Sequence, residues 1–197
     1  MTNIYPLINN QKYDSAYSAI MQHSNENVYF ALCTHRPGQN AGFFSLNLKT
    51  SITKELFNIS NILHSDLNSK QHGKIHTQLI EGIDNKIYFG THFAYPYGIP
   101  QSISYEGGRF ISYDPKDGTF LDFGVPKKGE GIISISIDLS NMQAYILTIP
   151  SGYLIKCDIE TKKFSTLGKI PTKGSICRNI ILDSNGKVYG SYEDNGI

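Results

Sequence analysis

The sequence contains no tryptophan and only three cysteines, an odd number. The absence of tryptophan excludes the Trp-Asp signature of WD repeats. Cys33, Cys157 and Cys177 show no metal-ligand spacing, and each lies in an apolar or alternating stretch. We therefore expect buried structural thiols and a reducing, cytoplasmic compartment.

Long apolar runs are also missing, since no stretch reaches the 18 or more residues of a membrane span. The first six residues lack the basic and apolar regions of a signal peptide. The 18 Lys and Arg residues nearly balance the 17 Asp and Glu residues. No global field would attract nucleic acid or an anionic membrane, so we expect neither as a partner.

Helical periodicity is almost absent, whereas 13 tyrosines and 10 phenylalanines suit β-strands. The exception is 51–70, where Leu56, Ile59, Leu63 and Leu67 fall near helical spacing. We interpret this segment as the end of a strand followed by a loop or short helix that links two blades.

A repeated pattern fixes the fold class. An asparagine followed within four residues by a tyrosine occurs at 27–29, 85–88, 141–145 and 185–189. A second motif places Asp114 and Asp158 44 residues apart at equivalent turns, with a fainter copy at 46–50. A period in the 40s, built of short strands and tight turns, is typical of β-propeller blades. The sequence therefore predicts an all-β protein, a β-propeller of four-stranded antiparallel blades.

We expect one domain over 1–197, with blades at approximately 13–70, 71–127 and 128–172 and an incomplete blade at 173–197. About three and a half blades are thus present, whereas a closed ring has 4–8 blades, or about 160–320 residues. Open sheet edges are normally removed by closure. We therefore expect a fragment of a larger propeller, with further blades from a longer chain or a second chain.

Within a blade, the strands would run as A, B, C and D. In the second blade we expect them at 75–82, 86–92, 109–113 and 119–123, and strand A of the fourth blade at 175–183. Antiparallel meandering puts the A–B and C–D turns on one face of the disc and the B–C loops on the other. The starts of A strands and the ends of B strands then meet at one rim of the channel, which gathers His35, His76, His92, Glu130 and Arg178.

The B–C loop of the second blade, 93–108, is long and carries Tyr95, Tyr97 and Tyr105. Long loops in repeat folds are often functional, and a tyrosine-lined wall suits stacking against a sugar or another flat polar ligand. With His35 and Arg109, these tyrosines are the ligand-binding candidates.

His76 and His92 are the candidate ligands for a divalent metal such as Mn, or else strand-end side chains that bond the backbone. Glu130 lies between two glycines and is either a proton-transfer group or a turn residue facing water. Arg178 interrupts an apolar strand and should meet an acid, with Glu130 as the internal candidate, or an anionic ligand. These four residues are the catalytic candidates.

The stretch 73–191 resembles bacterial propellers of the lyase-like or YVTN type, distantly similar to oligogalacturonate lyase and the streptogramin lyases. The resemblance lies in the segments 75–77, 87–92, 107–115, 129–134 and 150–152. It implies β-elimination at a channel mouth, with a metal or an arginine neutralising a carboxylate and a histidine or tyrosine moving the proton. His76 and His92 would then be metal ligands or bases, and Arg178 would hold the acid. The sequence departs from that pattern because it shows no complete ligand set.

Two functions from different classes follow. The first is a non-catalytic propeller that binds a sugar, a peptide or a protein through the histidine-bearing face. The alternative is a metal-assisted lyase or a hydrolase that acts on a carbohydrate-like or lactone substrate. The absence of a complete catalytic set favours the first.

Overall fold

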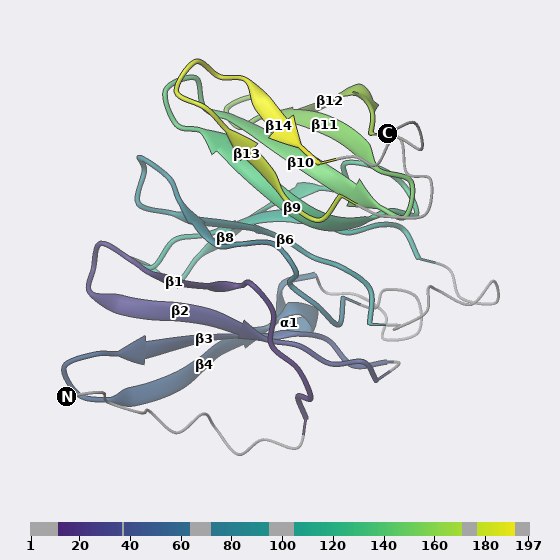
Figure 1. Cartoon of the computed structure of the whole chain (residues 1–197). Coiled ribbons are helices and arrows are strands. Elements are labelled where there is room, and N and C mark those ends of the chain that lie inside the picture. The colour runs from purple at the N-terminus through teal and green to yellow at the C-terminus, as the bar shows by residue number, and fades with distance from the viewer. Residues whose placement is uncertain (1–11, 37, 64–71, 95–104, 171–176, 192–197) are drawn as a thin grey trace.

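The computed structural model describes residues 12–36, 38–63, 72–94, 105–170 and 177–191. Three four-stranded antiparallel sheets and a further pair of strands follow one another along the chain (Figure 1). In each sheet the spatial order of the strands is their order in the sequence. This meander is consistent with propeller-like blades, and the predicted all-β class with four-stranded antiparallel sheets is confirmed.

The first blade consists of β1 (Ile20–Gln22), β2 (Asn27–Leu32), β3 (Gly42–Asn47) and β4 (Ile52–Asn58). The second contains β5 (Ile80–Glu81), β6 (Ile87–Gly90), β7 (Phe110–Tyr113) and β8 (Phe120–Gly124). The third contains β9 (Gly131–Asp138), β10 (Gln143–Ile149), β11 (Tyr153–Asp158) and β12 (Lys163–Lys169), and the fourth begins with β13 (Ile180–Leu182) and β14 (Val188–Gly190).

The short helix expected within 51–70 is α1 (Ile59–Leu63), which directly follows β4. It lies between the first and second sheets (Figure 1). In the part of the chain that the structure describes, no helix is long and apolar enough to cross a membrane.

The expected A strand of the second blade, 75–82, is mostly wrong, because only Ile80 and Glu81 form a regular ladder. The hydroxyl of Thr77 accepts the bond from the backbone N–H of Gly90 at 3.0 Å, so a side chain replaces the backbone carbonyl there. Pairing resumes at an isolated bridge between Lys74 and His92. In the fourth blade, β13 likewise begins only at Ile180, and the expected start at 175 lies outside the described residues.

In three of the four copies of the motif, the tyrosine hydroxyl forms a hydrogen bond with a side chain of the A–B turn. The hydroxyl of Tyr88 donates to Asp84 Oδ2 at 2.9 Å, and that of Tyr189 donates to Asp183 Oδ2 at 3.0 Å. The hydroxyl of Tyr29 instead accepts from Asn25 Nδ2 at 2.9 Å. In these blades the motif tyrosine therefore forms a side-chain hydrogen bond across a tight turn.

The second repeated motif marks the C–D turns. Asp114 Oδ1 accepts from the backbone N–H of Lys116 at 2.9 Å, and Asp158 Oδ1 accepts from that of Thr161 at 2.7 Å. The faded copy uses Asn47, whose Oδ1 accepts from the N–H of Lys49 at 3.0 Å. An Asp or Asn side chain that bonds its own backbone two or three residues later stabilises the turn locally.

The cores lie between neighbouring blades. Tyr29 and Phe43 of the first blade pack with Ile87 and Phe89 of the second, with the two phenylalanine rings stacked at 5.2 Å. A second cluster joins the second and third blades and a third joins the third and fourth. The three cysteines are free and buried, as expected, and burial raises the pKa of Cys33 to about 11.

Candidate functional site

The structure brings together His76 and His92, the two predicted metal ligands, with 4.8 Å between their ring centroids. His92 ends strand B at its bridge with Lys74, and His76 follows that lysine two residues later. His92 is buried against the ring of Phe93 and the backbone of Gly131. A Cβ at position 131 would lie 1.8 Å from His92 Nδ1, so this close approach requires glycine.

Both imidazoles are neutral at pH 7. Burial, reinforced by the positive charges of Lys74 and Arg178, lowers the pKa of His76 to about 3. Burial likewise holds the pKa of His92 well below its usual value. Nε2 of His76 and Nδ1 of His92 are buried without a hydrogen-bond partner among the described residues. A polar atom left in that state costs about 1–3 kcal/mol.

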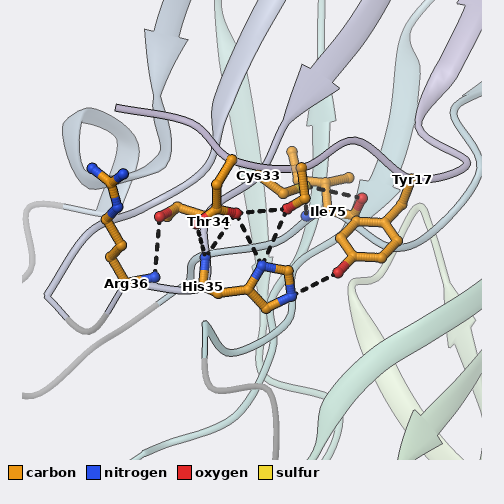
Figure 2. A network of polar contacts seen from close by, with 8 residues as sticks. Tyr17, Cys33, Thr34, His35, Arg36 and Ile75 are labelled. Atoms are coloured by element: carbon orange, nitrogen blue, oxygen red, sulfur yellow. Dashed lines mark hydrogen bonds and ion pairs between the residues drawn. The ribbon is translucent and has the colours of Figure 1, made fainter. Parts of the chain in front are cut away.

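Tyr17 connects this pair to His35 of the first blade. Its ring packs on that of His76, with centroids 3.9 Å apart, and its hydroxyl lies 2.9 Å from His35 Nε2. On the other side of the imidazole, His35 Nδ1 lies 2.9 Å from Asp14 Oδ1. Figure 2 shows the His35 ring pointing toward the Tyr17 hydroxyl, with its other nitrogen facing the opposite way. A carboxylate, an imidazole and a phenol are thus joined in one hydrogen-bonded chain.

Electrostatics define the protonation states of Asp14 and Tyr17, the two ends of this hydrogen-bonded series. Burial pushes the pKa of Asp14 upward, but the hydrogen bonds from the ring and backbone of His35 outweigh it and lower that pKa. Partial burial raises the pKa of Tyr17. Asp14 is therefore a carboxylate and Tyr17 a neutral phenol at pH 7. The exposed Tyr17 ring, 37% accessible, is the aromatic surface of the site.

Asp14 and Tyr17 were not among the predicted site residues, although the repeat contains a signal for Tyr17. Tyr17 lies twelve residues before the motif tyrosine Tyr29, and His76 lies twelve residues before Tyr88. The two side chains therefore occupy the same position of adjacent blades, three or four residues before strand A (β1 and β5). Counting back from each motif tyrosine would have found Tyr17.

Of the two partners considered for Arg178, an internal acid and an anionic ligand, the structure does not show the internal one, Glu130. The buried carboxylate of Glu130 accepts from Thr148 Oγ1 at 3.2 Å and from the backbone N–H of Ser151 at 2.9 Å, so it holds the loop after β10. Arg178 is exposed, and it precedes β13, which begins at Ile180. Its charge nevertheless contributes to lowering the pKa of both His76 and His92.

The predicted ligand-binding loop is described only in part, and Tyr95 and Tyr97 lie outside the described residues. Tyr105 is buried, edge-on to the ring of Phe93 at 5.7 Å, and its hydroxyl has no partner among the described residues. The Arg109 guanidinium is bonded to two carboxylates, donating to Glu106 Oε1 at 2.9 Å and to Asp122 Oδ2 at 2.5 Å. Its charge is therefore already balanced within the second blade.

The metal-ligand set stays incomplete. Within the described ranges, no group of three or more His, Cys, Asp or Glu side chains could hold a metal ion. His76 and His92 offer neutral imidazole nitrogens, the state that binds metals, but two ligands do not make a protein metal site. The described residues therefore do not fit a resident metal.

Two cavities open on the opposite face, between the A–B turns of neighbouring blades. One, of about 640 Å³, lies between the first and second blades, and another, of about 500 Å³, lies between the third and fourth. Their carboxylates already accept turn N–H groups: Asp138 bonds the backbone of Ser140, and Asp183 bonds that of Asn185. These acids therefore stabilise turns.

No protein-family model matches the sequence, and the search of curated proteins found no significant match. Solved structures do match. The extracellular domain of a protein described as a one-component system from B. thetaiotaomicron is 17% identical with a TM-score of 0.57, over 90% of this chain and 20% of that one. An auxiliary nutrient binding protein from Bacteroides ovatus is 12% identical with a TM-score of 0.57, over 91% of this chain and 36% of that one.

A chain of the nidogen/laminin complex is 14% identical with a TM-score of 0.52, over 82% of this chain and 52% of that one. The chain therefore spans from a fifth to about half of the length of these structures. At such identities the likeness concerns the fold, and the neighbours include propeller-like proteins. They agree with an all-β chain of propeller-like blades.

Proposed function

We propose that the chain binds a small polar ligand of the sugar type, without converting it, at the face that carries Tyr17, His35, His76, His92 and Arg178. The observation that carries the proposal is the exposed ring of Tyr17, which packs on the neutral imidazole of His76. The ring of His92 lies next to that of His76, and each of the two histidines has one buried nitrogen without a partner among the described residues. The apolar face of a sugar stacks on such a ring, and its hydroxyls pair with imidazole nitrogens.

The structural neighbours support binding over catalysis as the class. One is described as an auxiliary nutrient binding protein, and another as the extracellular domain of a one-component system. Both descriptions suit capture of a small molecule. A peptide or protein partner at the same face is a second possible kind of ligand, and it would bury the Tyr17 ring in the same way.

The proposal is tested by titrating the full chain with a panel of neutral and acidic mono- and oligosaccharides, observed by NMR or calorimetry. Tyr17→Ala should abolish binding of any sugar that the wild type binds, and His76→Gln should weaken it about tenfold, the effect of losing one good hydrogen bond. Phe120→Ala is the matched control, because Phe120 is 39% exposed and Tyr17 37%. Binding that survives Tyr17→Ala would overturn the proposed site.

The alternative of a metal-assisted lyase or hydrolase rests on the contact between His76 and His92. Calorimetry with Mn²⁺ and Zn²⁺ tests it on the folded chain and on His76→Ala and His92→Ala. We expect no stoichiometric binding, because the described residues supply two ligands. Stoichiometric binding that both variants lose would favour the enzyme and direct attention to uronate and lactone substrates.

A further inference from the structure

The motif tyrosine of each complete blade packs against the blade that follows, and these contacts define a tyrosine face. Tyr29 lies in the cluster that contains Ile87 and Phe89 of the second blade. Tyr88 lies in the cluster that contains Ala144 and Ile146 of the third blade. Tyr145 packs against the cluster that reaches the fourth blade. The same interface is thus built three times along the chain.

In the fourth blade this face is uncovered. Tyr189, the fourth motif tyrosine, is 50% exposed, and its cross-strand neighbour Ile181 is 66% exposed. The opposite side of β13 is covered, since Ile180 is buried against the third blade. Tyr189 and Ile181 are therefore exposed at the position where each preceding blade contacts the next one.

The first blade presents the complementary surface. Val28 and Phe30 occupy the positions that Ile87 and Phe89 hold in the second blade, one residue to each side of the motif tyrosine. They line an apolar groove of about 260 Å³, together with Tyr17, Leu32 and Leu46. Ile20, 62% exposed, lies in the same groove. We call this surface the groove face.

We infer that a second copy of this chain covers both surfaces, the tyrosine face of each copy docking on the groove face of the other. The two faces lie at opposite ends of the row of sheets, so one copy does not bring its own faces together (Figure 1). A head-to-tail contact that closes after two copies forms a ring. Each copy brings three complete sheets and part of a fourth, so two copies fall within the 4–8 blades of closed propellers.

The chain spans 52% of the nidogen/laminin chain and 46% of a chain of the mitotic checkpoint complex, which is about half of each, whereas it spans 36% and 20% of the nutrient binding protein and the extracellular domain. In such a ring the channel wall would come from both copies. The inference rests on the flat sides of the end blades and not on ligand binding, although Tyr17 belongs both to the groove face and to the candidate site.

Sedimentation and light scattering of the full chain test the inference over a hundredfold range of concentration. We expect a particle of twice 22.0 kDa for the wild type. Ile181→Glu and Ile20→Glu should each give monomers, because a buried unpaired carboxylate disfavours both contacts of the ring. Ile83→Glu is the matched control: Ile83 is 64% exposed, next to the A–B turn of the second blade, away from either end face.

Each outcome either supports or overturns the ring. Loss of the dimer in both Ile181→Glu and Ile20→Glu, with the dimer retained in Ile83→Glu, supports it. A wild-type monomer at the highest concentration overturns it, and leaves the two faces for blades of a longer chain. Loss of the dimer in Ile20→Glu alone would indicate that the groove faces of two copies pair with each other. Growth of the wild type into filaments would indicate a head-to-tail contact that does not close, and either result would overturn the ring.

Discussion

His76 links the candidate site to pH. In the folded chain its pKa is about 3, because burial and the charges of Lys74, Arg178 and His35 oppose protonation. An unfolded histidine has a pKa of about 6.5 and binds a proton below that pH. The unfolded state therefore takes up more protons between pH 6.5 and about 3, so the free energy of unfolding falls as the pH falls through this window. His92, with its pKa also lowered, acts in the same direction.

His76→Gln should remove one of the protons that the unfolded state takes up in this pH window. Below pH 6 the variant should lose stability less steeply than the wild type, by up to about 1.4 kcal/mol per pH unit. Urea unfolding at pH 5.0, 6.0, 7.0 and 8.0 measures the slope. Between pH 7 and 8 the difference between the two proteins should stay constant, which serves as the control. Equal slopes below pH 6 would mean that His76 is protonated in the folded chain.

Gly131 maintains the position of His92. An added Cβ would lie 1.8 Å from Nδ1 of the buried ring, so Gly131→Ala should displace His92 and destabilise the fold by about 1–3 kcal/mol. Gly168→Ala is the matched control, because a Cβ there meets nothing within 4 Å and that glycine also lies in a strand. Urea midpoints compare stability, and histidine NMR signals report the ring. A tolerated Gly131→Ala with an unmoved His92 signal would contradict this packing.

At the scale of the elements, a tyrosine–aspartate bond spans the A–B turn in two of the four copies of the motif. Tyr88→Phe removes the donor to Asp84 from a buried ring, so we expect a loss of about 1–2 kcal/mol in the free energy of unfolding. Tyr189→Phe removes the same bond to Asp183 from an exposed ring, and should cost less. Chemical unfolding of both variants compares the two turns. Equal losses would show that burial is not what gives the bond its strength.

The blades were predictable because their turns are local. Asp114 and Asp158 bond backbone groups within three residues, so sequence spacing alone records them. The grouping of His76 with His92 followed from strand direction. The bond between Tyr17 and His35 depends on side chains 18 residues apart, and motif spacing does not describe such pairs. Glu130 was mispaired because its choice of Ser151 depends on the conformation of the loop after β10.

At the scale of the whole molecule, the repeat has a consequence for stability. Each blade–blade contact buries apolar side chains that a single blade would expose to solvent. A row of blades is therefore most stable when the outer faces of its first and last blades are also covered. The groove face and the candidate site share Tyr17, whose ring lines the groove and packs on His76. Covering the end blades would therefore also order the edge of the site.

Thermal unfolding should reveal this coupling if two copies close the ring. For a dimer that unfolds to separate chains, a tenfold rise in protein concentration adds about 1.4 kcal/mol of stability per dimer, or roughly 2 °C in Tm for a particle of this size. Calorimetry of the wild type at two concentrations should show that rise. Ile181→Glu should unfold at a lower temperature, independent of concentration, because its exposed position leaves the folded monomer intact. A wild-type Tm that does not change with concentration would show that the end faces stay uncovered in solution.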